Sequence, residues 1–476
     1  MIAKVLTDEQ LKKINNASLT ILEKVGIHVP HEDMLKKFAD SGAKVDFKSR
    51  IVKIPYSLVS KSIDSAQKKY VLYGRNLEKK AEFGYGKRNY NAIAGEALWV
   101  DEIGGDRRYT TMADVAAAAR FCDALEYINI PGSMADPHGV DISWRSVEVL
   151  ATMIRNTSKP VTLWFHNRTA SKYIVDMIIG LRGSQKKAED FPLTYPFLEP
   201  ISPLKFPFNG IDLLYETARI NMPVPIGPMA QMGMSAPGTL AATMAVENAE
   251  ILAGVCITQL IRPGMPVCYG GICHAFDMKT TQMIFAGPEQ AIFGTAMTQL
   301  GKFHGFPVYI NVGLTDSKRP DAQAGLEAGV TLALGAAAGA DIFGHMGICG
   351  VDQATSLDML VLQNEIISYV ESVQREVEIS DDTLGLEVIA EAGPGGSFID
   401  SMFTAEHFRK ELWFPKLLDR DYYQAWLEKG ALSTEQKVKT KKDDILKNYK
   451  PEPVTAEQEK VLSECVKAAK KDLGKE

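Results

Sequence analysis

The sequence contains no long hydrophobic run and few cysteines. Its longest apolar stretches are interrupted by glycine, proline or polar residues, so none is predicted to span a membrane, which takes about 20 apolar residues. The first residues form no apolar signal core, so we expect a cytoplasmic protein. The six cysteines are scattered, as reduced thiols of cytosolic enzymes are. A net charge of −6 argues against a nucleic-acid-binding surface.

Well-known catalytic motifs are also missing. The sequence has no GxSxG, no phosphate-binding P-loop, no HExxH and no obvious pair of nucleophile and base. Cys268, Cys273 and His274 lie close together, but no CxxC or HxxxH spacing accompanies them, so we predict no protein-bound metal. These absences favour a reaction that needs little acid–base catalysis.

What the sequence does contain is enough apolar material for a large core. Of 476 residues, 46% are hydrophobic and 24% are charged, which suits one large domain with extensions. Residues 1–126 are predicted to form an N-terminal α+β extension. Capping boxes at Thr7–Gln10 and Thr111–Asp114 open two of its helices. Between them, short β-prone runs alternate with turn signals, which indicates antiparallel strands.

From residue 127 to residue 430, short apolar strands alternate with helical patterns eight times. Strands are predicted at 128–134, 161–165, 194–198, 224–228, 267–271, 308–313, 341–345 and 387–392. Helices are predicted at 143–156, 168–182, 209–220, 238–261, 287–304, 320–339, 354–377 and 404–428. Eight such pairs predict an α/β fold, a closed (β/α)8 TIM barrel. An open doubly wound sheet would have fewer strands and a GxGxxG turn, which is absent. Residues 431–476 are Lys/Glu-rich and are predicted to form C-terminal helices packed outside.

The active site of such a barrel lies at the carboxyl ends of its strands. Polar residues at those positions include Asp136, His138, His166, Glu199, Ser202, Gln231, His274, Asp277, Asn311, Asp316, Lys318, His345 and Glu391. His345 is the strongest candidate, because small neighbours in GADIFGHMG leave open space around it. We predict catalytic roles for His345 and Asn311, and substrate contacts from Trp99, His166, Gln231, Tyr269 and His345. Asp316 and the loop residues Gly393, Gly395 and Gly396 are predicted to bind a cofactor.

Each candidate also has a structural interpretation. His138 and His166 can be hydrogen-bonded residues of a barrel rim, and Asp316 with Lys318 can be an ion pair. The glycines at 393–396 can form only a tight loop.

Methyl transfer from a quaternary amine is a reaction that suits these absences. The amine leaves as a neutral base and needs no proton, so the protein has to hold a cation, align it and exclude water. Alignment can remove about 7–11 kcal/mol of the barrier, and an aromatic wall adds roughly 0.5–2 kcal/mol of cation–π binding. Aromatic residues available for that wall are Tyr90, Trp99, Trp164, Phe165 and Tyr269, although core packing is the more common role for any one of them taken singly.

Several stretches between residues 100 and 430 carry a resemblance to a known family. They include GGDRRYTTMADV (104–115), EPISPL (199–204), QMGMSAPGTLA (231–241), PGMPVCYGG (263–271) and GLTDSKRPDAQAGLE (313–327). Together with GPGGSFIDSMFTAEHFRKELWFPKLLDR (393–420), they resemble the trimethylamine methyltransferase family of corrinoid-dependent enzymes. Trimethylamine members carry pyrrolysine, whereas this sequence has standard residues only and resembles the non-pyrrolysine branch. One departure is visible, because Phe403-Thr404 stands where members often have His-Thr.

The resemblance implies a (β/α)8 barrel and a particular reaction. A methyl group of a quaternary amine, in the first place glycine betaine, would pass to cobalt(I) of a corrinoid (cobalamin) and leave dimethylglycine. No DxHxxG motif is present, so the corrinoid is expected on a separate partner protein. A glycine betaine site would have aromatic side chains at one end and donors such as His345 or Gln231 at the other. A homo-oligomer is also possible, with no nucleic acid or membrane partner.

Two other functions stay open at this point. A barrel lyase or aldolase would use a Schiff-base lysine, for which Lys318 is the one lysine well placed. A non-catalytic betaine-binding protein would bind betaine but transfer no methyl group.

Overall fold

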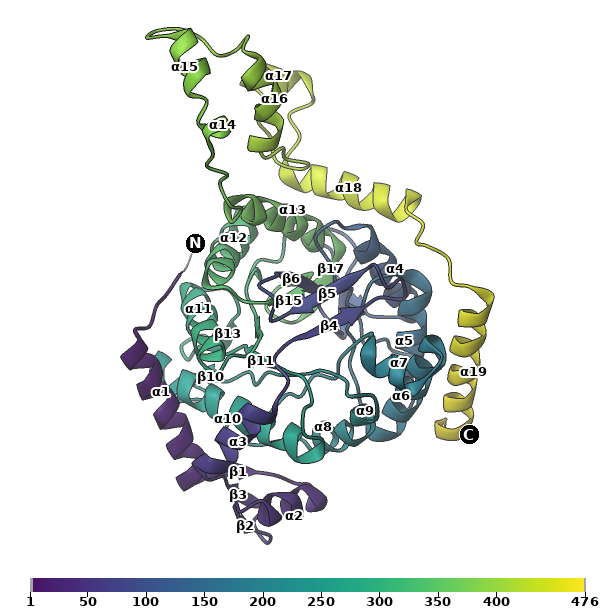
Figure 1. Cartoon of the computed structure of the whole chain (residues 1–476). Helices are drawn as coiled ribbons and strands as arrows, with labels where there is room; N and C mark the ends of the chain where they lie inside the picture. The colour runs from purple at the N-terminus through teal and green to yellow at the C-terminus, as the bar shows by residue number, and fades with distance from the viewer. Residues whose placement is uncertain (1–2, 475–476) are drawn as a thin grey trace.

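The computed structural model describes residues 3–474, in which a ring of helices surrounds a set of parallel strands (Figure 1). Five strands pair side by side in the order β6-β15-β14-β11-β9, and every pair is parallel. They are β6 (Asn89–Ala92), β9 (Val224–Ile226), β11 (Val267–Gly271), β14 (Val308–Ile310) and β15 (Ile342–Met346). The strands predicted to begin at residues 224, 267, 308 and 341 are therefore confirmed.

Isolated parallel bridges continue this sheet beyond both of its edges. The bridged pairs are Asn91 with Ile130, Gly132 with Thr162, and Leu198 with Ile226. The Val161 N–H also donates to the Leu193 carbonyl at 3.1 Å. These contacts lie in the segments predicted as the first three strands. Proline interrupts two of those segments, and because it has no N–H it cannot complete a ladder of hydrogen bonds.

The predicted eighth strand is wrong. Residues 387–392 belong to a helix, α15 (Leu386–Ala392), and the neighbour of β15 is instead β6. Leucine, glutamate and alanine dominate the α15 sequence and favour a helix. The β6 sequence Asn-Tyr-Asn-Ala has weak strand propensity, and its place is fixed by the strands beside it. Residues 1–126 therefore do not all lie outside the strand–helix repeat, as the sequence had suggested.

Seven of the eight predicted helices lie in the ring close to their predicted positions, whereas the eighth, predicted at 404–428, is two separate helices outside the ring. The helices of the ring are α4 (Met112–Ala124), α5 (Arg145–Asn156), α6 (Arg168–Arg182), α7 (Gln185–Asp190), α8 (Phe208–Asp212), α9 (Leu214–Thr217), η2 (Ala218–Ile220), α10 (Leu240–Ile261), α11 (Pro288–Phe303), α12 (Ala322–Ala338) and α13 (Leu357–Val373). By length and composition α10 alone of the described helices could cross a membrane. However, 78% of its most apolar window is buried inside the protein, which is typical of a core helix.

The N-terminal elements cover the outer face of α10. They are α1 (Asp8–Thr20), η1 (Ile21–Val25), β1 (Ile27–His28), α2 (Glu32–Asp40), β2 (Lys44–Asp46), β3 (Ile51–Lys53) and α3 (Tyr56–Ser65). Both α1 and α3 pack directly on α10. The capping boxes predicted at Thr7 and Thr111 are confirmed, and each satisfies backbone N–H groups at the start of a helix.

A hairpin, β4 (Tyr70–Tyr73) and β5 (Lys80–Phe83), lies at the amino-terminal ends of the parallel strands. Gln67 bridges to Pro266, just before β11. The Gly84 N–H donates to the Asp341 carboxylate at 2.9 Å, just before β15. Because the hairpin covers the amino-terminal ends of the strands, we expect an open site at their carboxyl-terminal ends.

Two small sheets stand at that carboxyl-terminal end. One contains β10 (Gln231–Met232), β12 (His274–Asp277) and β13 (Gln282–Ile284). The other contains β7 (Leu98–Val100), β8 (Arg107–Tyr109), β16 (Ile348–Cys349) and β17 (Ala354–Ser356). Both are built from segments that leave the parallel strands, so they frame the region where a site is expected.

Residues 378–432 form an arm that extends away from the ring (Figure 1). Its helices are α14 (Asp381–Leu384), α15, α16 (Met402–Glu411) and α17 (Tyr423–Glu428), and no residue of these four helices is buried. At its base, the Trp413 indole N–H donates to the Ser368 hydroxyl at 2.9 Å and its ring packs edge-on against Tyr369 of α13.

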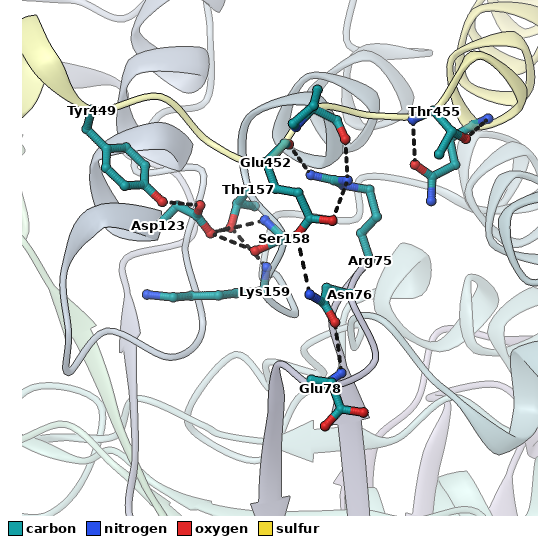
Figure 2. A network of polar contacts seen from close by, with 12 residues as sticks. Arg75, Asn76, Glu78, Asp123, Thr157, Ser158, Lys159, Tyr449, Glu452 and Thr455 are labelled. Atoms are coloured by element: carbon teal, nitrogen blue, oxygen red, sulfur yellow. Dashed lines mark hydrogen bonds and ion pairs between the residues drawn. The ribbon is translucent and has the colours of Figure 1, made fainter.

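The C-terminal helices α18 (Thr434–Asn448) and α19 (Ala456–Leu473) pack on the outside of the ring, as predicted. The linker between them is tied to the ring by polar contacts (Figure 2). The Asp123 carboxylate accepts from the Thr157 hydroxyl at 2.7 Å and from the Tyr449 hydroxyl at 2.6 Å. The Arg75 guanidinium donates to the Pro453 carbonyl at 3.0 Å.

This network leads to a prediction about the tail. Substituting Tyr449 with Phe should lower the free energy of unfolding by about 1.5 kcal/mol, because a half-buried hydrogen bond to a carboxylate is lost. Urea denaturation measures the change. The control is Tyr422→Phe, because the Tyr422 side chain is 92% exposed and its substitution should leave the free energy of unfolding unchanged. Equal stability of both variants would show that the Asp123 contact does not hold the tail.

Candidate functional site

A small cavity of about 100 Å³ lies at the carboxyl-terminal end of the parallel strands. It is lined by Asn91, Ile93, Ala94, Glu96, Thr162, Leu163, Trp164, Tyr195, Phe197, Glu199, Met229, Ile272, Tyr309, His345 and Asp352. These residues come from β6 and the loop after it, the two bridged segments around Thr162 and Leu198, β14, β15, the loops that follow β9 and β11, and the loop between β16 and β17. Nearly the whole ring of strands therefore contributes to one cavity, which is where a barrel enzyme binds substrate.

His345 reaches the cavity because the backbone of β15 is distorted there. The register between β15 and β6 shifts between Phe343 and Met346, as in a β-bulge. His345 itself has a φ of 69°, in the left-handed region that side chains other than glycine rarely adopt. A side chain at the preceding Gly344 would force the Tyr309 ring to move, since a Cβ there would lie 1.9 Å from the Tyr309 hydroxyl oxygen. This strain turns the imidazole toward the cavity and against the edge of the Tyr309 ring.

Three carboxyl groups share the cavity wall. Burial, and then the nearby Asp352 carboxyl, raise the pKa of Glu96 to about 8. Burial likewise raises the pKa of Asp352, and burial together with Asp352 raises the pKa of Glu199 to about 7. Within residues 3–474, none of the three forms an ion pair with lysine, arginine or histidine. No cationic side chain of the described residues therefore balances these acids, and their raised pKa values favour the protonated forms.

The rest of the wall is aromatic or neutral. Trp164 and Phe197 line the cavity, and the Trp164 indole N–H donates to the Gly95 carbonyl at 3.2 Å, which fixes the ring. Burial lowers the pKa of His345 to about 4, so its imidazole is neutral near pH 7. Aromatic faces beside carboxylates, without a positive charge, are the surroundings that a cationic ligand favours.

A wider mouth of about 490 Å³ adjoins the cavity. The two share Trp164, Phe197, Glu199 and Met229. Two predicted substrate residues, His166 and Gln231, line this mouth and not the inner cavity. The His166 Nε2 lies 3.2 Å from an Asp136 carboxylate oxygen, and Arg145 donates to the same carboxylate at 2.7 Å. His166 is thus a hydrogen-bonded residue of the rim.

Three other predicted site residues lie outside both spaces. The Tyr269 side chain is fully buried and its hydroxyl donates to the Asn248 side-chain oxygen at 2.9 Å, toward α10. Trp99 is buried in β7, where it pairs with Thr355 and Arg108. Both aromatics therefore serve core packing. Asn311 is buried beside the end of β14, and neither of its amide atoms has a hydrogen-bond partner within the described chain.

The predicted cofactor residues are not brought together. Asp316 accepts from the Phe285 N–H at 2.9 Å, so it holds two loops together. Gly393, Gly395 and Gly396 follow helix α15 on the arm, not a strand at the mouth. Lys318 does not line the cavity, and its ammonium donates to the Asp316 carbonyl at 2.8 Å.

Sequence reasoning missed the acidic part of the site. Glu199 stood among the strand ends but was given no role, and Glu96 and Asp352 were not considered. Glu96 follows β6, which was assigned to the extension, and Asp352 lies in the loop between β16 and β17. The signal that could have found Glu96 and Glu199 is their position shortly after parallel strand segments, whereas Asp352 follows the antiparallel strand β16 and carried no such signal. Between residues 3 and 474, no three histidine, cysteine or acidic side chains are placed to hold a metal ion.

Comparisons with known proteins agree with this architecture. The chain is 31% identical over 469 residues to trimethylamine methyltransferase MttB of Desulfitobacterium hafniense, with 98% of this chain and 94% of the relative covered. It is 29% identical to a glycine betaine methyltransferase of the same species, with 99% and 98% covered. The solved structure of monomethylamine methyltransferase (MtmB) of Methanosarcina barkeri shares the fold, with a TM-score of 0.50, 14% identity, and 98% and 94% of the two chains covered.

A family model decides the classification, because it matches nearly every residue. The model for trimethylamine methyltransferase (MTTB) aligns with residues 1–474. The resemblance of the quoted stretches is confirmed, and the chain belongs to the trimethylamine methyltransferase (MTTB) family.

Proposed function

We propose that this protein transfers a methyl group from a quaternary ammonium compound to the cobalt(I) of a corrinoid carried by a separate protein. The observation that carries the proposal is the small cavity in which Trp164 and Phe197 stand beside Glu96, Glu199 and Asp352. A quaternary ammonium cannot donate a hydrogen bond, so a protein holds it by shape, aromatic faces and nearby negative charge.

The residues of the cavity would act by binding and positioning. Trp164 and Phe197 would hold the ammonium group, and the carboxyl groups would balance its charge. The amine leaves as a neutral base, so no general acid is needed at this step. The walls would exclude water and align one methyl group with the mouth, an effect worth about 7–11 kcal/mol.

The mouth would admit the edge of a large flat cofactor delivered from outside. It is open and about 490 Å³ in volume, and two of its lining residues, Ile201 and Met234, are exposed apolar side chains. Corrinoid bound there would supply a cobalt(I) nucleophile as methyl acceptor. Trp164, Phe197 and Met229 would border the passage between the two spaces, through which the methyl group would face the acceptor, since they line both spaces.

A closed (β/α)8 barrel is part of the proposal. In it, β6 would be the eighth strand, and the segments around Ile130, Thr162 and Leu198 would complete the circle. The isolated bridges and the hydrogen bond from Val161 to Leu193 support this closure. A closed circle explains why residues from so many strands meet in one cavity.

Glycine betaine is the first substrate to test, with dimethylglycine as the product. It carries the trimethylammonium head that suits the cavity, and the glycine betaine methyltransferase of D. hafniense is a relative over the full length. The protein is mixed with cob(I)alamin and a panel of quaternary amines, and methylcobalamin is followed by absorbance. Transfer from any of them supports methyl transfer, whereas tight binding without transfer would support a binding protein instead. Lys318 lies outside the cavity, which disfavours a Schiff-base lyase.

His345→Ala is the variant that tests the predicted role of this residue. We expect ligand affinity to fall by about 1 kcal/mol, roughly fivefold, because a wall residue with an unpaired Nδ1 is lost. Titration calorimetry measures the change. His407→Ala on the arm is the control and should bind as the parent does. Unchanged affinity and unchanged transfer in His345→Ala would remove His345 from the site.

A homo-oligomer also remains a proposal. Large apolar side chains of the arm are exposed, among them Ile399 at 90% and Met402 at 71%. Exposed apolar surface of this kind is typical of protein contacts. Light scattering of the full chain would give the number of copies.

A further inference from the structure

We propose that the quaternary ammonium compound this cavity accepts carries a net positive charge and a hydroxyl group, in place of the carboxylate of a betaine. This inference rests on the proposed function and specifies its substrate class. A betaine and a hydroxyl-bearing cation such as choline share the same trimethylammonium head. They differ in the group at the other end of the molecule, which is a carboxylate in the betaine and a hydroxyl in the cation.

The charges of the cavity wall favour a tail without negative charge. Glu96, Glu199 and Asp352 are the ionisable acids of the lining. Its single basic side chain, among the described residues, is His345, which is neutral because burial lowers its pKa to about 4. A carboxylate in a cavity of about 100 Å³ would have to lie near these acids, and none of the described lining residues is a cation that would balance it. The ionised forms of these acids would repel a carboxylate tail and so oppose its binding.

An unpaired acceptor in the wall points to a donor on the ligand. Asn91 is 1% exposed and lines the cavity, and its side-chain oxygen has no hydrogen-bond partner within the described chain. The amide nitrogen of the same side chain donates to the Ala92 carbonyl at 3.2 Å, which fixes which atom is free. A buried acceptor needs a donor, and a hydroxyl group supplies one whereas a carboxylate does not.

A metal ion would fit this cavity less well than an organic cation. Within the described residues, the three carboxyl groups are not placed together as ligands of one ion. They lie around an aromatic wall, which suits an organic cation.

The reaction of such a substrate is balanced without a further reactant. The bond between nitrogen and one methyl carbon breaks, and its electron pair stays on nitrogen, which becomes a neutral tertiary amine. The methyl group passes to cobalt(I), which supplies both electrons of the new bond and is thereby oxidised to cobalt(III). No proton is taken up or released in this exchange.

Choline and glycine betaine are matched probes, because they differ in the alcohol and carboxylate ends. Titration calorimetry of the full chain, without corrinoid, should give at least about tenfold tighter binding of choline. Calcium chloride serves as the metal probe and should produce no saturable heat. Equal or tighter binding of glycine betaine, or saturable calcium binding, would overturn the inference.

Substitution of one acid tests the cause of the preference. Glu199→Gln keeps the shape of the side chain, removes its charge, and should narrow the preference for choline over glycine betaine. Glu23→Gln, an exposed residue outside the cavity, is the control and should keep the full preference. A preference that persists unchanged in Glu199→Gln would show that Glu199 does not set it.

The methyl-transfer assay separates this inference from the proposed function. Methyl transfer to cob(I)alamin from glycine betaine but not from choline would overturn the inference and leave the proposed function standing. Tight binding of choline with no transfer from any quaternary amine would overturn the proposed function, while the binding preference would stand.

Discussion

Substituting Gly132 with Ala should destabilise this protein by about 3 kcal/mol or more, above the usual cost of one added methyl group. A Cβ at this position would lie 2.0 Å from the Ile93 carbonyl oxygen and 2.3 Å from the Ala92 carbonyl oxygen. Both are backbone atoms that cannot move aside on their own. The segment would have to part from β6, with loss of the hydrogen bonds from Ala92 to Ile130 and from Met134 to Ile93.

Urea denaturation followed by circular dichroism measures this effect. The control is Gly325→Ala in α12, where no neighbouring atom lies within 4 Å of the new Cβ and the backbone is helical. Alanine favours a helix over glycine, so this variant should gain about 0.5–1 kcal/mol. A Gly132→Ala protein as stable as its parent would contradict the packing of residues 128–134 on β6, and with it the proposed closure.

The repeat could be predicted from sequence wherever local pattern and fold agree. The runs at 224, 267, 308 and 341 are apolar, β-prone and followed by long helical patterns, and each became a strand. β6 could not be found in this way, because Asn-Tyr-Asn-Ala has little strand preference and acquires its conformation from β15 and from Ile130. Residues 387–392 show the opposite case, in which a strand is predicted and a helix is found. The apolar run predicts a strand, but the glutamate and alanine residues within it favour a helix.

Two residues at the ends of recognised strands line the cavity. His345 ends the predicted strand 341–345, and Glu199 follows the predicted strand 194–198, although no role was predicted for Glu199. Glu96 was missed together with β6, because the strand that positions it was not recognised. Tyr269 belongs to a recognised strand, but alternate side chains of a strand face opposite ways, and its hydroxyl reaches Asn248 in the helix layer. The rule that site residues lie at the carboxyl ends of strands selects positions in the sequence. Whether a residue at such a position lines the cavity or packs in the core depends on the direction of its side chain.

The affinity for choline should rise with pH, by about 100-fold from about pH 5.5 to about pH 7.5 if one proton is released on binding. In the free protein, burial raises the pKa of Glu199 to about 7 and that of Glu96 to about 8, so both are largely protonated at the lower pH. A permanent cation interacts favourably with the ionised form only. Each proton released makes the affinity change up to tenfold per pH unit.

The stability of the free protein should change in the opposite direction over the same range. An ordinary glutamate in the unfolded chain ionises near pH 4.5, whereas Glu96 and Glu199 stay protonated in the folded chain until about pH 7 to 8. Between those limits the folded state binds more protons than the unfolded state, so stability falls as pH rises. Thermal unfolding should therefore show a lower midpoint near pH 8 than near pH 5 without ligand, and a smaller difference with choline.

Calorimetry in buffers of different ionisation enthalpy counts the protons released. We expect the parent protein to release about one proton on binding choline near pH 7, and Glu199→Gln to release fewer. The choline affinity of Glu199→Gln should therefore vary less with pH. The control Glu23→Gln should behave as the parent does. His345 does not contribute to the pH dependence of choline affinity in this range, because its pKa is about 4. An affinity that does not vary with pH, with no proton released, would mean that the three carboxyl groups do not meet the ammonium group. The aromatic wall of Trp164 and Phe197 would then be the whole of the cation site.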